Sequence, residues 1–190
     1  MTWMLTATGR KIDIANVMPQ DIDILDIAAH LAKIPRFTGA CRQAWSVAEH
    51  CCLVADILAD RYPDDIDLQL CGLLHDAPEY ILQDLSTPVK DLVGGLYRPL
   101  ERSLWWAVAE RFGLPMRLPD AVRHADLVAL ATEKRDLMPP HPEPWSVLEG
   151  IEPHPRTTID VELGWRAAQR LFLEQFHELQ AARADARGTA

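Results

Sequence analysis

Residues 68–79 read LQLCGLLHDAPE, an apolar run of helical character that ends at the adjacent pair His75 and Asp76. Two ionisable side chains at the end of a buried helix cost free energy unless a partner compensates them. His50 upstream and Asp126 downstream add a second imidazole and a second carboxylate. Divalent metal ions use imidazole nitrogen and carboxylate oxygen as ligands in hydrolytic sites. We therefore expect a metal ion as the partner of this pair.

Composition limits the class of protein. The chain has 190 residues, of which 48% are hydrophobic and 25% charged, which predicts one globular domain over 1–190 with its core at about 21–182. With no long uncharged apolar stretch and no recognisable signal peptide, we expect a cytoplasmic protein without membrane contact. The net charge of -9 argues against a nucleic-acid polymer as partner but is compatible with a small phosphorylated substrate. The four cysteines form no CxxC pair and are interpreted as reduced, buried thiols, with a disulfide or a thiolate metal site as the alternative.

Periodicity and turn residues predict an all-α fold with one small N-terminal β element. Residues 3–14 have β character around the turn at Thr8 and Gly9, which indicates a hairpin. Ser46 and Glu49 have the spacing of a capping box. A rigid, non-helical loop is expected at residues 139–144, and a bend at 76–78. Helices are expected over residues 21–34, 44–59, 64–76, from 88 to a bend or break at Pro99, then 101–112, 120–137 and 161–182.

Three of these helices can bring the four ligand candidates to one point. His50 lies on the apolar side of the 44–59 helix, His75 and Asp76 end the next helix, and Asp126 falls in the 120–137 helix. The ligand types suit manganese, iron, cobalt, nickel or zinc, and affinity order does not choose among them. Such an ion would acidify a water and polarise a phosphoryl oxygen. Spacing alone leaves the alternative of core histidines and capping aspartates open.

An ordered set of motifs resembles the HD-domain metal-dependent phosphohydrolases. The matching strings are SVAEH at 46–50, LLHDAPE at 73–79, DLSTPVK at 84–90 and HAD at 124–126. They are most similar to the small bacterial and phage branch that includes 5'-deoxynucleotidases and phage deoxyadenosine triphosphate triphosphohydrolases. The resemblance covers about residues 3–180. It implies an HD-type helical bundle and metal ligation by His50, His75, Asp76 and Asp126, and it allows a second ion such as Mg²⁺.

The resemblance also assigns roles that single residues do not reveal. Glu79 is expected to orient the attacking water or move its proton, where local sequence alone would favour a solvated first-turn glutamate. Asp84, alone a turn-capping residue, is expected near the sugar hydroxyl or a second metal. Phosphate contacts are implied for Arg36, Lys90 and Arg123, and contact with the base or sugar for Phe37, where related enzymes frequently carry tryptophan.

Residues further along the same helix are expected to brace it. Three charged residues follow Asp126 on the 120–137 helix, namely Glu133, Arg135 and Asp136. We expect them to form ion pairs that support this ligand-bearing helix. Trp145, next to the Pro-rich loop, is a candidate for the mouth of the pocket. Trp105 and Trp106 are interpreted as core or subunit-interface residues.

These observations predict a metal-dependent nucleotide phosphohydrolase, most of all a 5'-deoxynucleotidase that converts deoxynucleoside monophosphates to deoxynucleoside and phosphate. The main alternative is a deoxynucleoside triphosphate phosphohydrolase. A hydrolase of cyclic dinucleotides or guanosine tetraphosphate is a weaker one, since the further histidines usual there are not found. Outside enzymes, the alternatives are a nucleotide sensor that retains the fold and a purely structural bundle. A homo-oligomer, dimeric or larger, is expected from the resemblance.

Overall fold

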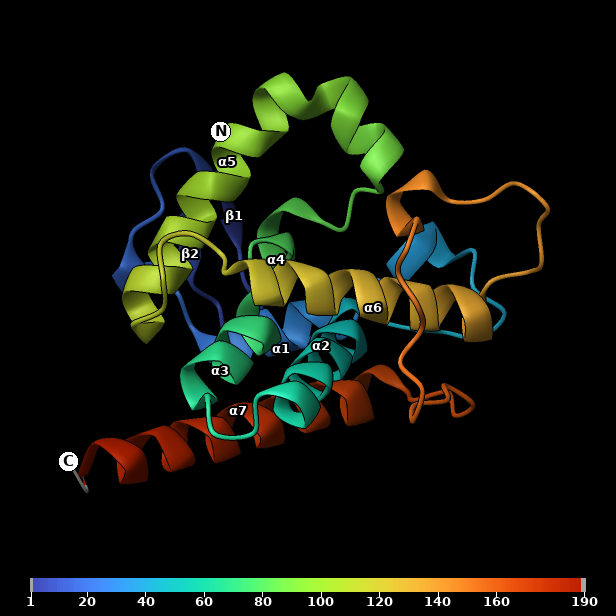
Figure 1. Cartoon of the computed structure of the whole chain (residues 1–190). Coiled ribbons are helices and arrows are strands. Elements are labelled where there is room, and N and C mark those ends of the chain that lie inside the picture. Colours follow the sequence, from blue (N-terminus) through green and yellow to red (C-terminus); the bar gives the residue numbers. More distant parts are fainter. Residues whose placement is uncertain (1, 189–190) are drawn as a thin grey trace.

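The computed structural model describes residues 2–188 and is mostly α-helical, with a two-stranded antiparallel hairpin at its N-terminal end (Figure 1). This confirms the predicted fold class. The strands are β1 (Trp3–Leu5) and β2 (Lys11–Asp13). The α-helices are α1 (Ile24–Leu31), α2 (Val47–Arg61), α3 (Ile66–Leu74), α4 (Glu79–Leu82), α5 (Thr87–Phe112), α6 (Asp120–Leu137) and α7 (Trp165–Gly188).

The N-terminal hairpin is fastened to the first helix by a buried carboxylate. Met4 of β1 lies opposite Ile12 of β2, and Gly9 turns the chain with a φ of 83°. The backbone N–H of Thr8 donates to Asp26 Oδ1 at 2.7 Å, and the Thr8 hydroxyl donates to Oδ2 at 2.8 Å. Asp26 is fully buried in α1, so these bonds satisfy its charge and fix the hairpin on the helix.

Capping side chains set where the helices begin. Asp23 accepts from the backbone N–H of Leu25 at the start of α1. The predicted capping box is present, because Ser46 Oγ accepts from the Glu49 backbone N–H while Glu49 accepts from that of Ser46. This box places the start of α2 at Val47 rather than at residue 44. The last helix likewise differs from its predicted bounds, since α7 spans Trp165–Gly188 rather than 161–182.

Helix α5 bends but does not break, where a bend or a break was predicted at Pro99 (Figure 1). It keeps helical assignment from Thr87 to Phe112 with Pro99 inside it. Its ribbon arches, and Figure 1 shows the first half rising away from the other helices. A proline in a helix interior removes one donor and crowds the preceding turn, which bends the axis without necessarily ending the helix.

Helix α2 is the centre of the packing. It contacts α1, α3, α6 and α7, and α7 runs along the outer side of α1, α2 and α3 (Figure 1). Eleven of the residues of α2 are buried, His50 among them, so the helix carries a ligand candidate directly into the core. Across residues 2–188 no helix combines the length and apolarity that a membrane span requires.

The close approach of α2 and α3 depends on a glycine. A methyl group at Gly72 would overlap Leu58 Cδ1 and lie 3.5 Å from Val54 Cγ1. Gly72 is three residues before His75, and its carbonyl accepts a hydrogen bond from His75 Nδ1 at 2.7 Å. A substitution here therefore disturbs both the helix pair and the imidazole that follows.

We expect Gly72→Ala to lower the free energy of unfolding by about 1–3 kcal/mol, since overpacking of a filled core outweighs the better helix propensity of alanine. Gly95→Ala is the matched control, because a methyl group there meets nothing within 4 Å and should stabilise α5 slightly. Urea unfolding of both variants measures the difference. Equal stability of Gly72→Ala and the parent protein would contradict the packing described.

Candidate metal centre

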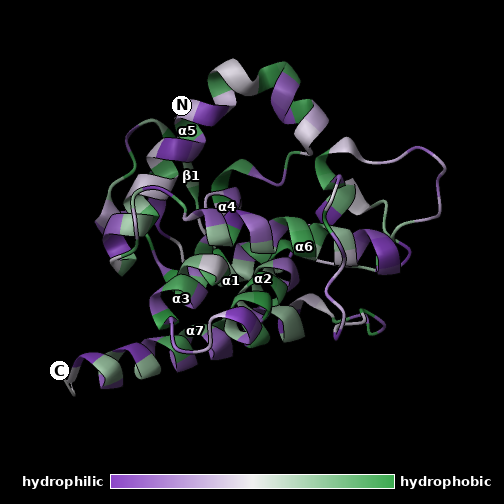
Figure 2. Cartoon of the chain, viewed as in Figure 1, coloured by the Kyte–Doolittle hydropathy of each residue, from purple (hydrophilic) through white to green (hydrophobic). Residues whose placement is uncertain are grey.

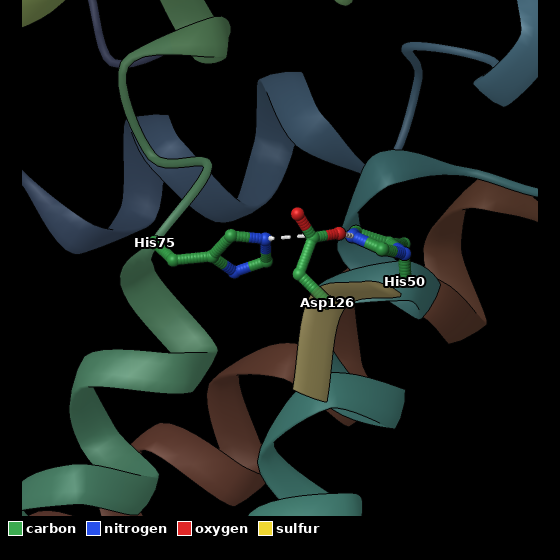
Figure 3. Close-up of side chains that lie close together, drawn as sticks. All are labelled: His50, His75 and Asp126. Atoms are coloured by element: carbon green, nitrogen blue, oxygen red, sulfur yellow. Dashed lines mark ion pairs between the residues drawn. The ribbon is translucent and has the colours of Figure 1, made fainter. Parts of the chain in front are cut away.

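Four predicted ligands from three parts of the fold converge on one point. His50 comes from α2, His75 ends α3, and Asp126 reaches between them from α6 (Figure 3). Asp126 Oδ1 lies 3.1 Å from His50 Nε2 and 3.9 Å from His75 Nε2. Asp76 Oδ2 lies 3.3 Å from His75 Nε2 and 3.6 Å from His50 Nε2. His50, His75 and Asp126 thus form a group that could hold a metal ion, and Asp76 lies beside both imidazoles.

The imidazole rings are oriented for metal binding. Each ring uses its Nδ1 elsewhere, for His50 with Glu133 Oε1 at 2.7 Å and for His75 with the Gly72 carbonyl at 2.7 Å. The Nε2 atoms are both buried and satisfy no hydrogen bond, although carboxylate oxygens lie nearby. Buried polar atoms are rarely left without a partner, and a ligating histidine typically donates its other N–H to a carboxylate or carbonyl. The residues present therefore fit a divalent ion.

The two carboxylates of the centre, Asp76 and Asp126, need positive charge beside them. Burial alone would lower the pKa of His75, but Asp76 outweighs it and raises that pKa well above 6.5. Burial would raise the pKa of Asp76, but His75 and His50 hold it well below 3.8. The pKa of Asp126 is likewise lowered from 3.8, by His50 and His75. The carboxylates therefore stay charged, and protons on the imidazoles balance them when no metal does.

Glu133 supports the centre from behind. Its carboxylate is fully buried, and besides His50 it accepts from Trp45 Nε1 at 2.8 Å and from Arg36 at 3.1 Å. Burial would raise its pKa, but Arg36 and His50 lower it from 4.5 to about 2. Its contribution to stability is thus complete above pH 4.5 and is lost as the pH falls toward 2. This placement fits the bracing role expected for Glu133.

Arg135 and Asp136, contrary to expectation, do not support the metal ligands but hold the loop that precedes α7. They pair with each other, and Arg135 also donates to the carbonyls of His154 and Thr157. Asp136 accepts from the backbone N–H of Ile159 at 2.9 Å. These bonds fasten the loop before α7 to the end of α6 and do not reach the metal ligands.

A cleft of about 780 Å³ opens beside the centre. Besides the carboxylates of Asp76 and Asp126, its wall carries five of the predicted residues: Arg36, Phe37, Glu79, Asp84 and Lys90. Arg123, the third predicted phosphate contact, is exposed on α6 and is not part of this wall. The cleft therefore unites the predicted substrate and proton-transfer residues except Arg123, while the ligand candidates His50 and His75 are also outside its wall.

Glu79 has the environment of a proton-transfer group. Only 2% of it is exposed, its Oε1 lies 3.1 Å from Lys90 Nζ, and its Oε2 is buried without a partner. Burial raises its pKa well above 4.5, helped by the charges of Asp76 and Asp84 and opposed by Lys90. A carboxyl group with a raised pKa exchanges its proton closer to neutral pH, as a general base or acid does.

The two cations of the cleft are held by carboxylates. Arg36 is buried and lies 3.5 Å from Asp84 and 3.1 Å from Glu133, while its Nε has no partner. Lys90 pairs with Glu101 at 3.1 Å as well as with Glu79. Each cation is thus fixed in place and keeps hydrogen-bond donors for a bound anion.

An aromatic wall completes the cleft. Phe37 follows Arg36 in the 3-10 helix Arg36–Gly39, and its ring centroid lies 5.9 Å from that of Trp145. Phe37 and Thr38 adopt φ values of 53° and 55°, a left-handed conformation that costs free energy in residues other than glycine. Such strain clusters at functional sites. Trp145 directly follows the Pro-rich loop at residues 139–144, and this position was the sequence signal for a residue at the pocket mouth.

Two neighbours of the centre were not predicted. Trp45 donates to Glu133, and Glu101 holds Lys90, but neither lies in a motif that marks it. Cys51 lies with His75 and Asp76 in a second group that could hold a metal, the kind of thiolate site that the sequence left open as the alternative to a buried thiol. Cys41, Cys51, Cys52 and Cys71 are all free, in agreement with the interpretation as reduced cysteines.

We expect Glu133→Gln to weaken binding of Mn²⁺ or Zn²⁺ by about 10–100-fold, because His50 loses the carboxylate that orients and polarises its ring. Asp120→Asn, an exposed carboxylate on the same helix, is the matched control and should bind like the parent protein. Titration calorimetry of the folded variants measures both. Unchanged affinity in Glu133→Gln would show that this contact does not tune the centre.

The chain is similar to two uncharacterized bacterial proteins. No family model matches it. It is 32% identical over 183 residues to YfdR of Escherichia coli K12, an uncharacterized protein, and the match covers 96% of this chain and 98% of YfdR. It is 41% identical over 142 residues to the uncharacterized protein RCAP_rcc00048 of Rhodobacter capsulatus, covering 71% of this chain and 72% of that protein. The chain therefore belongs to the family of proteins that includes YfdR.

Proposed function

We propose that this protein is an HD-type, metal-dependent phosphohydrolase that acts on deoxynucleoside 5'-monophosphates and releases deoxynucleoside and inorganic phosphate. One observation carries the proposal. The buried Nε2 atoms of His50 and His75, which lack a hydrogen-bond partner, face the carboxylates of Asp76 and Asp126 at the edge of a cleft that also holds a buried carboxyl group and two cations. This is the combination that metal-assisted hydrolysis of a phosphate ester requires.

The four ligands and their neighbours define what an ion would do here. His50, His75, Asp76 and Asp126 would hold it, and their donor atoms suit Mn²⁺, Fe²⁺, Co²⁺, Ni²⁺ or Zn²⁺. When bound, the ion supplies Lewis acidity, which lowers the pKa of water and withdraws charge from a phosphoryl oxygen. Asp84 lies in the same cleft wall as Asp76 and Asp126, where its carboxylate would serve the sugar hydroxyl or a second ion such as Mg²⁺.

Protein groups provide proton transfer and charge stabilisation. Glu79 accepts the proton of the attacking water as the new oxygen–phosphorus bond forms. The bond from phosphorus to the 5' oxygen breaks, and the same carboxyl group returns the proton to that leaving oxygen. Arg36 and Lys90 donate hydrogen bonds to the phosphoryl oxygens, whose charge increases during the transfer.

The aromatic wall is suited to a nucleoside. Phe37 and Trp145 both line the cleft, with ring centroids 5.9 Å apart and planes tilted by 46°. Each ring also has a cation over it, Arg36 over Phe37 and Lys134 over Trp145, so we expect a base to use the part of these rings that faces the cleft. Stacking of a base on an aromatic ring is worth about 1–3 kcal/mol and tolerates different bases. The side chain of Asp84 is an acceptor for a sugar hydroxyl.

Charge balance favours a monophosphate over a triphosphate. Arg36 already faces Asp84 and Glu133, and Lys90 already faces Glu79 and Glu101. Arg123, which could have served further phosphates, is not part of the cleft wall. A triphosphate would bring several more negative charges to a site that lacks free cations to neutralise them.

The test is hydrolysis by metal-stripped protein supplied with Mn²⁺, Co²⁺ or Zn²⁺ and a panel of deoxynucleoside mono- and triphosphates. We expect phosphate release from monophosphates, and a fall in kcat of about 10²–10⁴-fold in Glu79→Gln with metal binding retained, because the proton acceptor is lost. Glu110→Gln, an exposed glutamate of α5, is the matched control.

The other outcomes separate the alternatives. Release of triphosphate would assign the protein to the triphosphohydrolases. Nucleotide binding without any product, with metal bound, would indicate a sensor. Full activity in Glu79→Gln would remove this residue from the mechanism.

A further inference from the structure

The residue that precedes Asp84 has a backbone conformation that only glycine adopts freely. Gln83 ends α4 with a φ of 68° and a ψ of 158°. This region of backbone space is essentially confined to glycine, because the side-chain Cβ of any other residue crowds the backbone there. Gln83 is exposed, so packing of its side chain does not hold it in this conformation. The contacts of its backbone must hold it instead.

The backbone of Gln83 is bonded through both of its polar groups. Its N–H donates to the Glu79 carbonyl at 2.8 Å, and its carbonyl accepts from the hydroxyl of Tyr97 at 3.0 Å. Tyr97 lies in α5, 14 residues further along the chain, and only 8% of it is exposed. A buried tyrosine hydroxyl usually has a hydrogen-bond partner, and here the partner is this carbonyl. The bond therefore ties α5 to the turn that carries Asp84.

The ring of Tyr97 contacts a cation of the cleft. Lys90 Nζ lies 5.4 Å from the centroid of this ring, within the range of a cation–π contact. The same ammonium group lies 3.1 Å from Glu79 and from Glu101. Hydrophilic and hydrophobic segments alternate along the arch of α5 (Figure 2), and its polar residues Lys90 and Tyr97 make these contacts with the cleft region. One side chain thus contacts both a cleft cation and the turn before a cleft carboxylate.

We propose that Tyr97 is a positioning residue of the cleft. Its hydroxyl holds Gln83 at a positive φ, which places Asp84 in the cleft wall, and its ring supports Lys90. Tyr97 itself does not line the cleft, so it acts through these two neighbours. Without the hydroxyl, Gln83 can relax to a negative φ, and the chain would then leave α4 in another direction. The effect on catalysis rests on the proposed function, whereas the control of Gln83 by Tyr97 does not.

Amide hydrogen exchange, measured residue by residue by NMR, tests this control. Tyr97→Phe removes the hydroxyl and keeps the ring. We expect the protection factor of the residue 83 amide to fall about tenfold, since one neutral hydrogen bond contributes about that factor to an equilibrium. Adding Gln83→Gly to Tyr97→Phe should restore the protection, because glycine keeps a positive φ without help from the hydroxyl.

Tyr62→Phe is the matched control for the loss of a tyrosine hydroxyl. Tyr62 is half-buried, follows α2 and lines a different cavity, so this variant should exchange like the parent protein at residue 83. Unchanged protection in Tyr97→Phe would overturn the proposal. Lost protection that Gln83→Gly does not restore would also overturn it, because the hydroxyl would then act through general packing.

Turnover of a deoxynucleoside monophosphate separates positioning from a purely structural role. We expect kcat to fall about tenfold or more in Tyr97→Phe, because a displaced Asp84 misaligns the substrate, and to recover when Gln83→Gly is added. Full kcat despite lost protection would show that Tyr97 does not position the cleft. A parent protein that hydrolyses no nucleotide would refute the proposed function, and hydrogen exchange would still decide whether Tyr97 fixes Gln83.

Discussion

The buried carboxylate of Glu133 is the constraint on which the site depends. It contacts His50 on α2, Arg36 in the segment that precedes α2, and Trp45 just before the capping box. A charge this deeply buried is tolerated only when several partners satisfy it, and Arg36, His50 and Trp45 together hold the pKa of Glu133 below 4.5. One side chain of α6 thereby fixes a metal ligand and a cleft cation in the same arrangement.

The rest of the centre follows from this fixed arrangement. With His50 Nδ1 committed to Glu133 and His75 Nδ1 committed to the Gly72 carbonyl, only the Nε2 atoms can face Asp76 and Asp126. Two charged carboxylates beside two imidazoles then require positive charge at their centre. The same charges extend along the cleft, where burial and the neighbouring carboxylates Asp76 and Asp84 raise the pKa of Glu79 well above 4.5. The groups proposed for metal binding, anion binding and proton transfer thus lie close enough to influence one another's charge.

Much of this could be predicted from local sequence. The hairpin around Gly9, the Ser46–Glu49 capping box and the helices follow from periodicity and turn residues, because these features depend on neighbours along the chain. The four ligand candidates were also identifiable from their types and order. The bounds of α2 and α7 were less accurate, since tertiary packing and caps decide the terminal turns.

Features that depend on distant contacts could not be predicted. The contact of His50 with Glu133 joins residues 83 apart in the chain. Arg123 is three residues before Asp126, yet the exact helix phase leaves it exposed outside the cleft wall. Trp105 is buried and donates to the Met116 carbonyl, while Trp106 is 42% exposed, so the two adjacent tryptophans cannot share one role. Such differences are set by how helices pack, which no local pattern encodes.

The central claim is that these imidazoles and carboxylates bind a divalent ion. Titration calorimetry of metal-free protein with Mn²⁺, near neutral pH in two buffers of different ionisation enthalpy, tests it directly. The account predicts one saturable site with release of protons, because the raised pKa of His75 means that Nε2 must lose a proton before it can ligate, so affinity falls as pH decreases. His75→Ala should abolish the site. Absence of saturable binding, or equal binding in His75→Ala, would contradict the account.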